Sequence, residues 1–334
     1  MSFGATILDA EGLRLTPSER DFFRDANPFG FILFARNIDT GDQLRALCAD
    51  MRDAVGRSAP ITIDQEGGRV QRLTPPLARQ WLPALDHVAR AGEHAERAMY
   101  LRFRLIAAEL HALGIDSNCA PLGDLARADT HHFLRNRCYG DTVETVACIA
   151  RAVAPGLLDG GVLPVVKHMP GHGRATLDTH FDLPAVTLDK TILMTSDFAV
   201  FRALNDLPMG MTAHLVFTEI DDRPATLSPR VMDMIRKDIG FDGLIMTDDI
   251  SMKALNGSLG DLSAAAIRAG CDVVLGCNQD LATRIEIAEA AGEMTQEAEQ
   301  RAIAALAARH MPEPFDAAAA EAELHEIMGG EPVG

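Results

Sequence analysis

The segment from Lys167 to His180, KHMPGHGRATLDTH, brings together the side chains of this chain that are best suited to proton and charge chemistry. It holds one lysine, three histidines and one aspartate, separated by glycine and proline residues that typically mark loops. Histidine and aspartate can donate or accept protons near neutral pH. A connecting loop has no need for this density of reactive groups, so the segment indicates an active-site loop rather than a polar surface turn.

Three residues have the types expected of a catalytic set. Asp248 directly follows the apolar run GLIMT, so a strand end would hold its carboxylate rigidly, as a nucleophile requires. His180 lies on the glycine-containing loop, and the ordinary imidazole pKa of about 6.5 suits a group that first donates and then accepts a proton. Asp178, two residues earlier, could hydrogen bond to that imidazole and raise its basicity.

Four further residues could bind a sugar. Asp64 could accept hydrogen bonds from a pair of hydroxyls, and Arg72, Arg137 and Lys167 could donate to hydroxyl, amide or carboxylate oxygens. Asp249, beside Asp248, is expected to cap a loop or to pair with an arginine rather than to react.

Two other polar residues near these motifs also have a structural alternative. Arg69 could brace the turn at Gly67 and Gly68 instead of contacting a ligand. For His172, which stands between two glycines, holding the shape of the loop and serving the site are both left open.

Eight short apolar runs alternate with longer amphipathic stretches and predict strands. Pro164 inside the fifth run is unusual, because proline cannot donate to a strand ladder. Between the runs, helices are predicted at 92–113, 141–159 and 189–204, and Thr16-Pro17-Ser18-Glu19 has the pattern of a capping box. The predicted strands are 5–9, 30–34, 60–63, 115–119, 162–166, 209–213, 243–247 and 272–276.

This alternation predicts an α/β fold, a single (β/α)8 barrel over residues 1–334, with a doubly wound open sheet as the alternative. Residues 295–334 are expected to form trailing helices and a flexible tail. Active sites of such barrels lie at the carboxyl ends of the strands. The polar residues follow the predicted strands and should therefore meet on one rim: Asp64 and Arg72, Asp124 and Arg137, Lys167 and His168, His214, and Asp248.

Composition excludes several classes of partner. The chain has 334 residues, 47% hydrophobic and 24% charged, with a net charge of −17 and no basic run, so nucleic acid and anionic membranes are not expected as partners. No signal peptide and no apolar run of about 20 residues is visible. Six scattered cysteines without a C-x-x-C pair indicate reduced thiols, and we expect a cytoplasmic monomer.

Three segments resemble glycoside hydrolase family 3, and specifically its bacterial single-domain β-N-acetylglucosaminidases of peptidoglycan recycling. They are IDQEGGRVQR (63–72), KHMPGHGRATLDTH (167–180) and FDGLIMTDDISM (241–252), and the chain between them is also similar, from about Leu8 to Asn278. The resemblance implies a (β/α)8 barrel and a retaining reaction through a glycosyl-enzyme intermediate. It also implies an exo-acting enzyme that needs no cofactor or metal and acts on a small muropeptide or chitooligosaccharide-like substrate.

Carried over to this sequence, the resemblance makes Asp248 the nucleophile and His180 the acid/base, with Asp178 as its dyad partner. The residues implied to bind N-acetylglucosamine are Asp64, Arg72, Arg137, Lys167 and His168. The chain departs from the family pattern at Thr179, where serine is commoner, and at Met169, where an aromatic residue is frequent. Larger members use a glutamate from a second domain as acid/base, and we expect this chain to use the histidine instead.

Three alternatives stay open at this point. The first is a family 3 phosphorylase, which would pass the sugar to phosphate instead of water. The second is a non-catalytic sugar-binding protein on the same fold. The third is a metal-dependent barrel hydrolase, whose ligands would come from His168, His172, His180, Asp178 and Asp248.

Overall fold

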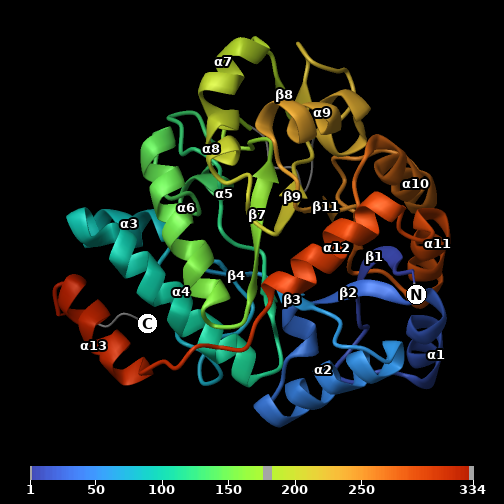
Figure 1. Ribbon diagram of the computed structural model, residues 1–334, viewed down its shortest axis with the longest axis horizontal. Coiled ribbons are helices and arrows are strands. Elements are labelled where there is room, and N and C mark those ends of the chain that lie inside the picture. Colours follow the sequence, from blue (N-terminus) through green and yellow to red (C-terminus); the bar gives the residue numbers. More distant parts are fainter. Residues whose placement is uncertain (1, 176–182, 331–334) are drawn as a thin grey trace.

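Eight parallel strands close into a barrel in the computed structural model, which describes residues 2–175 and 183–330 (Figure 1). Going around the barrel, the order is β1-β12-β11-β9-β7-β6-β3-β2. The first strand pairs with both β2 and β12, so the ring is closed and the open-sheet alternative is wrong. The strands are β1 (Gly4–Asp9), β2 (Pro28–Leu33), β3 (Ile61–Ile63), β6 (Ser117–Asn118), β7 (Leu163–Met169), β9 (Met209–Thr212), β11 (Leu244–Asp249) and β12 (Val273–Gly276).

All eight predicted strands are confirmed, and Pro164 is accommodated for a local reason. Leu163 and Val165 direct their N–H groups to carbonyls at the β6 side, those of Asp116 and Ala120. The nitrogen of Pro164 therefore faces β9, whose pairing with β7 begins only at Val165. A ladder donor is not needed at that position, so the proline costs the sheet no hydrogen bond.

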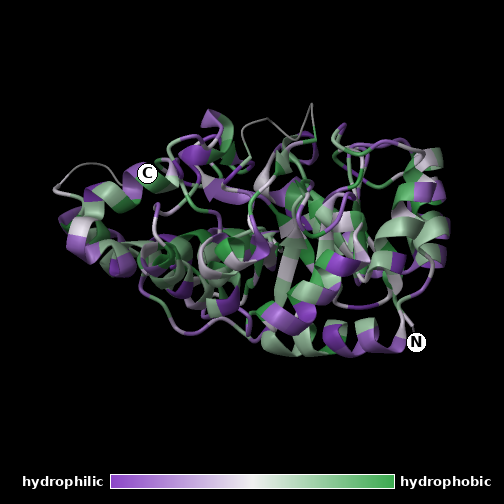
Figure 2. Cartoon of the chain, turned by 90° about the horizontal axis from the view of Figure 1, so that it is seen from above, coloured by the Kyte–Doolittle hydropathy of each residue, from purple (hydrophilic) through white to green (hydrophobic). Residues whose placement is uncertain are grey.

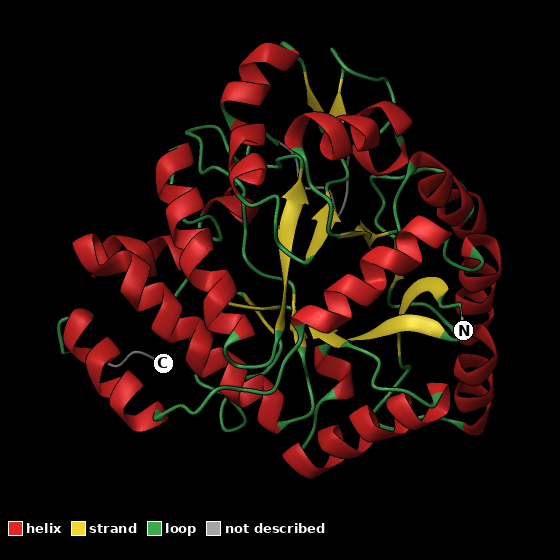
Figure 3. Ribbon diagram, viewed as in Figure 1, coloured by secondary structure: helices red, strands yellow, loops and turns green. Residues whose placement is uncertain are grey.

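Helices surround the barrel as an outer layer (Figure 3). Their surfaces alternate between hydrophobic and hydrophilic residues (Figure 2), as expected of helices with one face packed on strands. The longer ones are α1 (Pro17–Ala26), α2 (Gly41–Val55), α3 (Ala84–Ala91), α4 (Ala95–Ala112), α6 (Val143–Leu158), α10 (Leu259–Ala269), α11 (Leu281–Ala291), α12 (Gln296–Ala308) and α13 (Ala317–Ile327). No helix within the described ranges is long and apolar enough to cross a membrane.

Most predicted helix boundaries hold to within a few residues. Helix α1 begins with the predicted capping box, in which Thr16 Oγ1 accepts from the Glu19 amide at 3.1 Å and the Glu19 carboxylate accepts from the Thr16 amide at 2.9 Å. The predicted trailing helices are α12 and α13. Helix α12 contacts β11, and α13 packs on α4 at the left edge of Figure 1.

The single helix predicted over residues 189–204 is wrong. The segment forms two shorter helices, α7 (Lys190–Thr195) and α8 (Asp197–Ala203), which meet at Ser196 in a non-helical conformation. The Ser196 hydroxyl donates to the Ile192 carbonyl at 2.7 Å and contacts the Asp197 carboxylate at 2.9 Å. Serine competes for backbone groups in this way, and the hydrophobic period alone does not reveal the break.

Candidate active site

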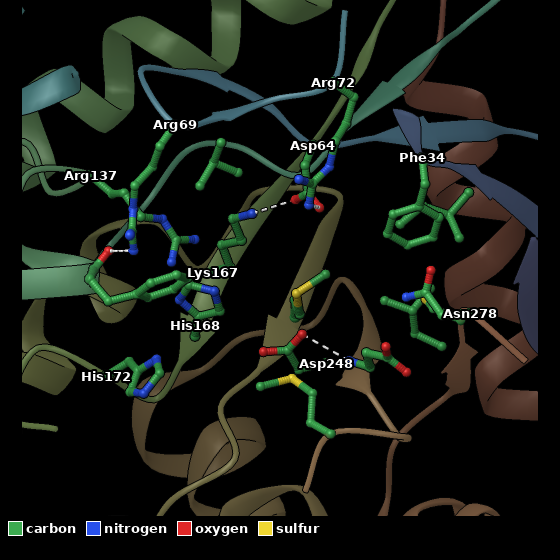
Figure 4. Close-up of a pocket in the computed structure, with 18 residues that line it drawn as sticks. Phe34, Asp64, Arg69, Arg72, Arg137, Lys167, His168, His172, Asp248 and Asn278 are labelled. Carbon is green, nitrogen blue, oxygen red and sulfur yellow. Dashed lines mark hydrogen bonds and ion pairs between the residues drawn. The ribbon is translucent and has the colours of Figure 1, made fainter. Parts of the chain in front are cut away.

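A cavity of about 520 Å³ opens at the carboxyl ends of the barrel strands (Figure 4). Six of the eight site residues predicted from the sequence line it together: Asp64, Arg72, Arg137, Lys167, His168 and Asp248. The other two, Asp178 and His180, lie outside the described residues. The polar residues that follow different strands therefore do meet on one rim, as the barrel prediction required.

A network of ion pairs forms one wall of the cavity. The Lys167 ammonium donates to Asp64 at 2.8 Å and contacts Glu66 at 2.6 Å. Arg72 donates to the second oxygen of Asp64 at 3.0 Å, and Arg137 binds Glu66 through two bonds of 2.9 and 2.8 Å. Together, three cations and two carboxylates offer a fixed array of donors and acceptors for sugar hydroxyls.

The members of this network stay ionised at neutral pH. Burial works to raise the pKa of Asp64, but the Lys167 and Arg72 charges outweigh it and hold that pKa well below its usual range. For Lys167 the signs are reversed: burial lowers the pKa, and the Asp64 and Glu66 carboxylates raise it by more. The array is therefore set before substrate binds, because no proton has to move to form it.

Glu66 is a site residue that the sequence reasoning did not assign. It lies on β4 (Gln65–Gly67), which forms a small antiparallel hairpin with β5 (Val70–Gln71). Its side chain is 3% exposed, and a carboxylate so deeply buried needs cationic partners. The only sequence signal is its place two residues after Asp64, directly before Gly67 and Gly68.

Asp124 orients the two described histidines of the active-site loop. Its carboxylate accepts from Nδ1 of His168 at 2.7 Å and from the backbone amide of His172 at 2.7 Å. Nδ1 of His168 therefore carries a proton, while the ring itself lies in the cavity (Figure 4). The amide of His172 helps to hold the shape of the loop, and its ring lines the cavity with a pKa lowered to about 3, mainly by burial.

Asp248 stands at the end of β11 with its carboxylate in the cavity (Figure 4). The amide of Asp249 donates to its Oδ1 at 2.8 Å. Burial works to raise the pKa of Asp248, but the neighbouring His214 and His168, the Asp249 amide and Lys167 together lower it by more, so the net direction is down. The group is thus a carboxylate at neutral pH, held at a strand end beside the donor array.

Comparison with known proteins fits this geometry. Residues 10–310 match the glycosyl hydrolase family 3 N terminal domain. The β-hexosaminidase of Bordetella avium is 36% identical over 293 residues, which cover 84% of this chain and 82% of that protein. The chain belongs to glycosyl hydrolase family 3.

Solved structures of family 3 members are also similar to this chain. Native NagZ from Neisseria gonorrhoeae superposes with a TM-score of 0.85 at 30% identity, covering 99% of this chain and 97% of NagZ. The complex of that NagZ with N-trifluoroacetyl-D-glucosamine gives a TM-score of 0.80 at 29% identity, covering 98% and 99%, and its complex with zinc ion gives 0.83 at 29%, covering 99% and 97%. As a family 3 member with these relatives, the chain is a glycosidase.

The structure shows the contacts of two polar neighbours of the family 3 site, Asp249 and Arg69. Asp249 caps a loop, as predicted: its Oδ1 accepts from the amide and the hydroxyl of Ser251 at 3.0 and 2.8 Å. Arg69 lies over the ring of Phe133, 3.4 Å from its centroid, and hydrogen bonds to the Phe133 carbonyl. Both Arg69 and Phe133 line the cavity. Their contact links the β4–β5 hairpin to the short helix α5 (His132–Arg135), which precedes Arg137.

The opposite wall of the cavity is made by residues that no motif singled out. Phe34 and Asn278 project from the ends of β2 and β12 (Figure 4), and Cys277 lies beside them. Burial raises the pKa of the Cys277 thiol well above its ordinary value, which keeps this thiol protonated and unreactive at neutral pH. Aromatic and amide side chains at strand ends are common in many folds, so only the assembled barrel identifies them as lining residues.

No three histidine, cysteine, aspartate or glutamate side chains in residues 2–175 and 183–330 are grouped so that they could hold a metal ion. Two of the ligands considered for a metal site, Asp178 and His180, fall in the segment between these ranges.

Proposed function

We propose that this chain is an exo-acting, retaining β-N-acetylglucosaminidase that uses Asp248 as nucleophile and His180, oriented by Asp178, as general acid and base. The observation that carries the proposal is the shared cavity. A strand-end carboxylate with a lowered pKa lies beside an ionised donor array suited to sugar hydroxyls. The complex of Neisseria gonorrhoeae NagZ with N-trifluoroacetyl-D-glucosamine supports N-acetylglucosamine as the sugar.

The proposed reaction has two steps. In the first, an Asp248 oxygen attacks the anomeric carbon while His180 donates a proton to the departing glycosidic oxygen, which leaves a glycosyl ester on Asp248. In the second, His180 removes a proton from water, and the water oxygen attacks the same carbon and releases Asp248. Asp64, Arg72, Arg137, Lys167 and His168 would hold the sugar hydroxyls and the acetamido group throughout.

The proposed natural substrate is a GlcNAc–anhydro-N-acetylmuramyl fragment, with or without a peptide, from recycled cell wall. The similarity to bacterial β-hexosaminidases supports this choice, and a cavity of about 520 Å³ suits a small ligand. The six free cysteines support the cytoplasm as the compartment.

The decisive test compares aryl β-N-acetylglucosaminide and aryl β-glucoside as substrates of the wild type and of Asp248→Ala. The wild type should release chromophore from the N-acetylglucosaminide far faster than from the glucoside, and Asp248→Ala should lose at least about 1000-fold in kcat. Binding of N-acetylglucosamine without any chromophore release by the wild type would favour a sugar-binding protein instead.

The same assay separates the remaining alternatives. Products are analysed with and without inorganic phosphate, since a phosphorylase would release N-acetylglucosamine 1-phosphate. Full activity after dialysis against a chelator is expected, because the proposed steps use side chains alone. Loss of activity in chelator, restored by zinc, would instead favour the metal-dependent hydrolase.

A further inference from the structure

The end of β11 that carries Asp248 has little regular strand pairing. On one side, the ladder with β9 comprises Leu244, Ile245 and Met246. On the other side, the register with β12 shifts between Met246 and Asp249, and pairing resumes where Asp249 lies opposite Leu275. Position errors at a reacting group are costly, so the β9 side of this strand end needs another support.

His214 lies where the β9 ladder would have continued. It comes two residues after the end of β9 and is 1% exposed. Its Nε2 lies 2.9 Å from the carbonyl oxygen of Asp249. A carbonyl oxygen has no proton to give, so Nε2 must be the donor. The imidazole thus takes the place of the ladder amide that β9 no longer supplies.

This contact reaches the Asp248 carboxylate through a single residue. The carbonyl of Asp249 accepts from His214, and the amide of Asp249 donates to Oδ1 of Asp248 at 2.8 Å. Both backbone groups of Asp249 are therefore engaged, one by the histidine and the other by the carboxylate. A rotation of this residue would disturb both bonds together.

The far side of the His214 ring is also fixed. Its Nδ1 lies 2.8 Å from the hydroxyl of Thr226, and that hydroxyl lies 2.8 Å from the hydroxyl of Thr212 at the end of β9. Both threonines are completely buried. The ring is consequently held from two sides, and the support runs from one barrel strand to the tip of the next.

We propose that His214 is a positioning residue that holds the Asp248 carboxylate in its attacking orientation through the carbonyl of Asp249. This inference rests on the proposed role of Asp248. His214 is almost fully buried and is not among the described residues that line the cavity, so its loss should impair the chemical steps that use Asp248 and leave binding of the sugar intact.

The test compares His214→Gln with His214→Asn. Glutamine can place an amide N–H near the position of Nε2, whereas the shorter asparagine reaches only the position of Nδ1. We expect kcat for aryl N-acetylglucosaminides to fall about 100-fold in His214→Asn and by less than about tenfold in His214→Gln. The Kd of N-acetylglucosamine, measured by calorimetry, should stay within about twofold of the wild type in both.

A structural role alone would give another pattern. Equal losses in both variants, or a Kd that rises in step with the loss of kcat, would overturn the inference. If His214→Asn does not fold, Thr226→Val provides a second test, because it removes the hydroxyl but keeps the shape of the side chain. Its kcat should fall about tenfold at unchanged Kd, and an unchanged kcat would also overturn the inference. An inactive wild type would instead reject the proposed function itself.

Discussion

Glu66 shows how strongly a single buried carboxylate can govern this site. It binds Arg137 through two bonds and also contacts Lys167, and its own exposure is only 3%. Replacing it with glutamine would leave both cations short of a partner. Because removing one member of a buried ion pair typically costs roughly 3–5 kcal/mol, Glu66→Gln should unfold at clearly lower temperature.

The same variant should bind sugar less well, because Arg137 and Lys167 would no longer be held in place. We expect KM for an aryl N-acetylglucosaminide to rise about tenfold or more. Glu289→Gln, the same change on the exposed face of α11, is the control and should alter neither property. An unchanged KM in Glu66→Gln would show that the two cations are positioned by other groups.

Asp249 gives a pH dependence of known sign. Burial, with a smaller contribution from Asp248, raises its pKa to about 6, above the value of about 3.9 expected in the unfolded chain. The folded state therefore holds this proton more tightly, and the stabilisation is present below about pH 4 and lost as pH rises through 6. Asp249→Asn keeps the oxygen that accepts from Ser251 and cannot ionise.

Relative to the wild type, Asp249→Asn should therefore gain unfolding free energy between pH 4 and pH 7.5. Urea unfolding at a series of pH values measures this difference. If the unfolding free energies of the two proteins changed with pH in parallel, Asp249 would titrate alike in the folded and unfolded states.

At the scale of elements, the β4–β5 hairpin places Glu66 and is itself placed by a glycine. Gly67 has φ 101°, and a Cβ there would lie 1.9 Å from Nη2 of the buried Arg102. Gly92 also has a positive φ, 56°, but a Cβ there would meet nothing within 4 Å. Gly92→Ala should therefore lose about 1 kcal/mol of unfolding free energy, mainly from backbone strain. Gly67→Ala should lose clearly more unfolding free energy and should also raise KM. Thermal unfolding and steady-state kinetics of the pair decide the matter, and equal losses would remove the steric argument.

The elements themselves were largely predictable. Apolar runs identified all eight strands, and periodicity and capping residues identified α4, α6, the start of α1 and the trailing helices, because burial on both faces and helix ends leave local signals. The break at Ser196 was not predictable, since it depends on which backbone groups a hydroxyl happens to reach. The roles of Glu66, Asp124 and His214 were missed for a related reason: each is defined by a partner distant in sequence, and the chain alone does not show the pairing.

For the molecule as a whole, the alternation of strands and helices predicted the closure of the barrel. The stability of the fold at acid pH, in contrast, depends on packing that only the structure shows. His87 is completely buried beside Trp81, and its ring nitrogens have no hydrogen-bond partner among the described residues. Burial, assisted by the charge of Arg102, lowers its pKa to about 2, far below the unfolded value of about 6.5. The folded state therefore disfavours the charged ring, so stability present above pH 6.5 is lost as pH falls below it.

His87→Leu should shift acid unfolding to lower pH, because an apolar side chain of similar size needs neither a proton nor a partner there. The midpoint can be followed by circular dichroism during acid titration. His111→Leu, at an exposed position of α4, is the matched control and should leave the midpoint in place. An equal shift of the midpoint in both variants would show that the acid sensitivity does not come from the buried imidazole of His87.

Strand β7 runs through Lys167, whose amide donates to the carbonyl of Pro121 at 3.0 Å and whose carbonyl accepts from the amide of Gly123 at 2.7 Å. The backbone of Lys167, a residue proposed to bind sugar, is therefore held by the segment after β6, whereas Arg137 sits on a loop after a single turn of helix. Anyone wishing to retune the enzyme for a different sugar should begin with the loop arginine and leave the strand lysine alone. Substitutions of Arg137 leave the strand pairing of the barrel unchanged, provided that the new side chain still pairs with Glu66.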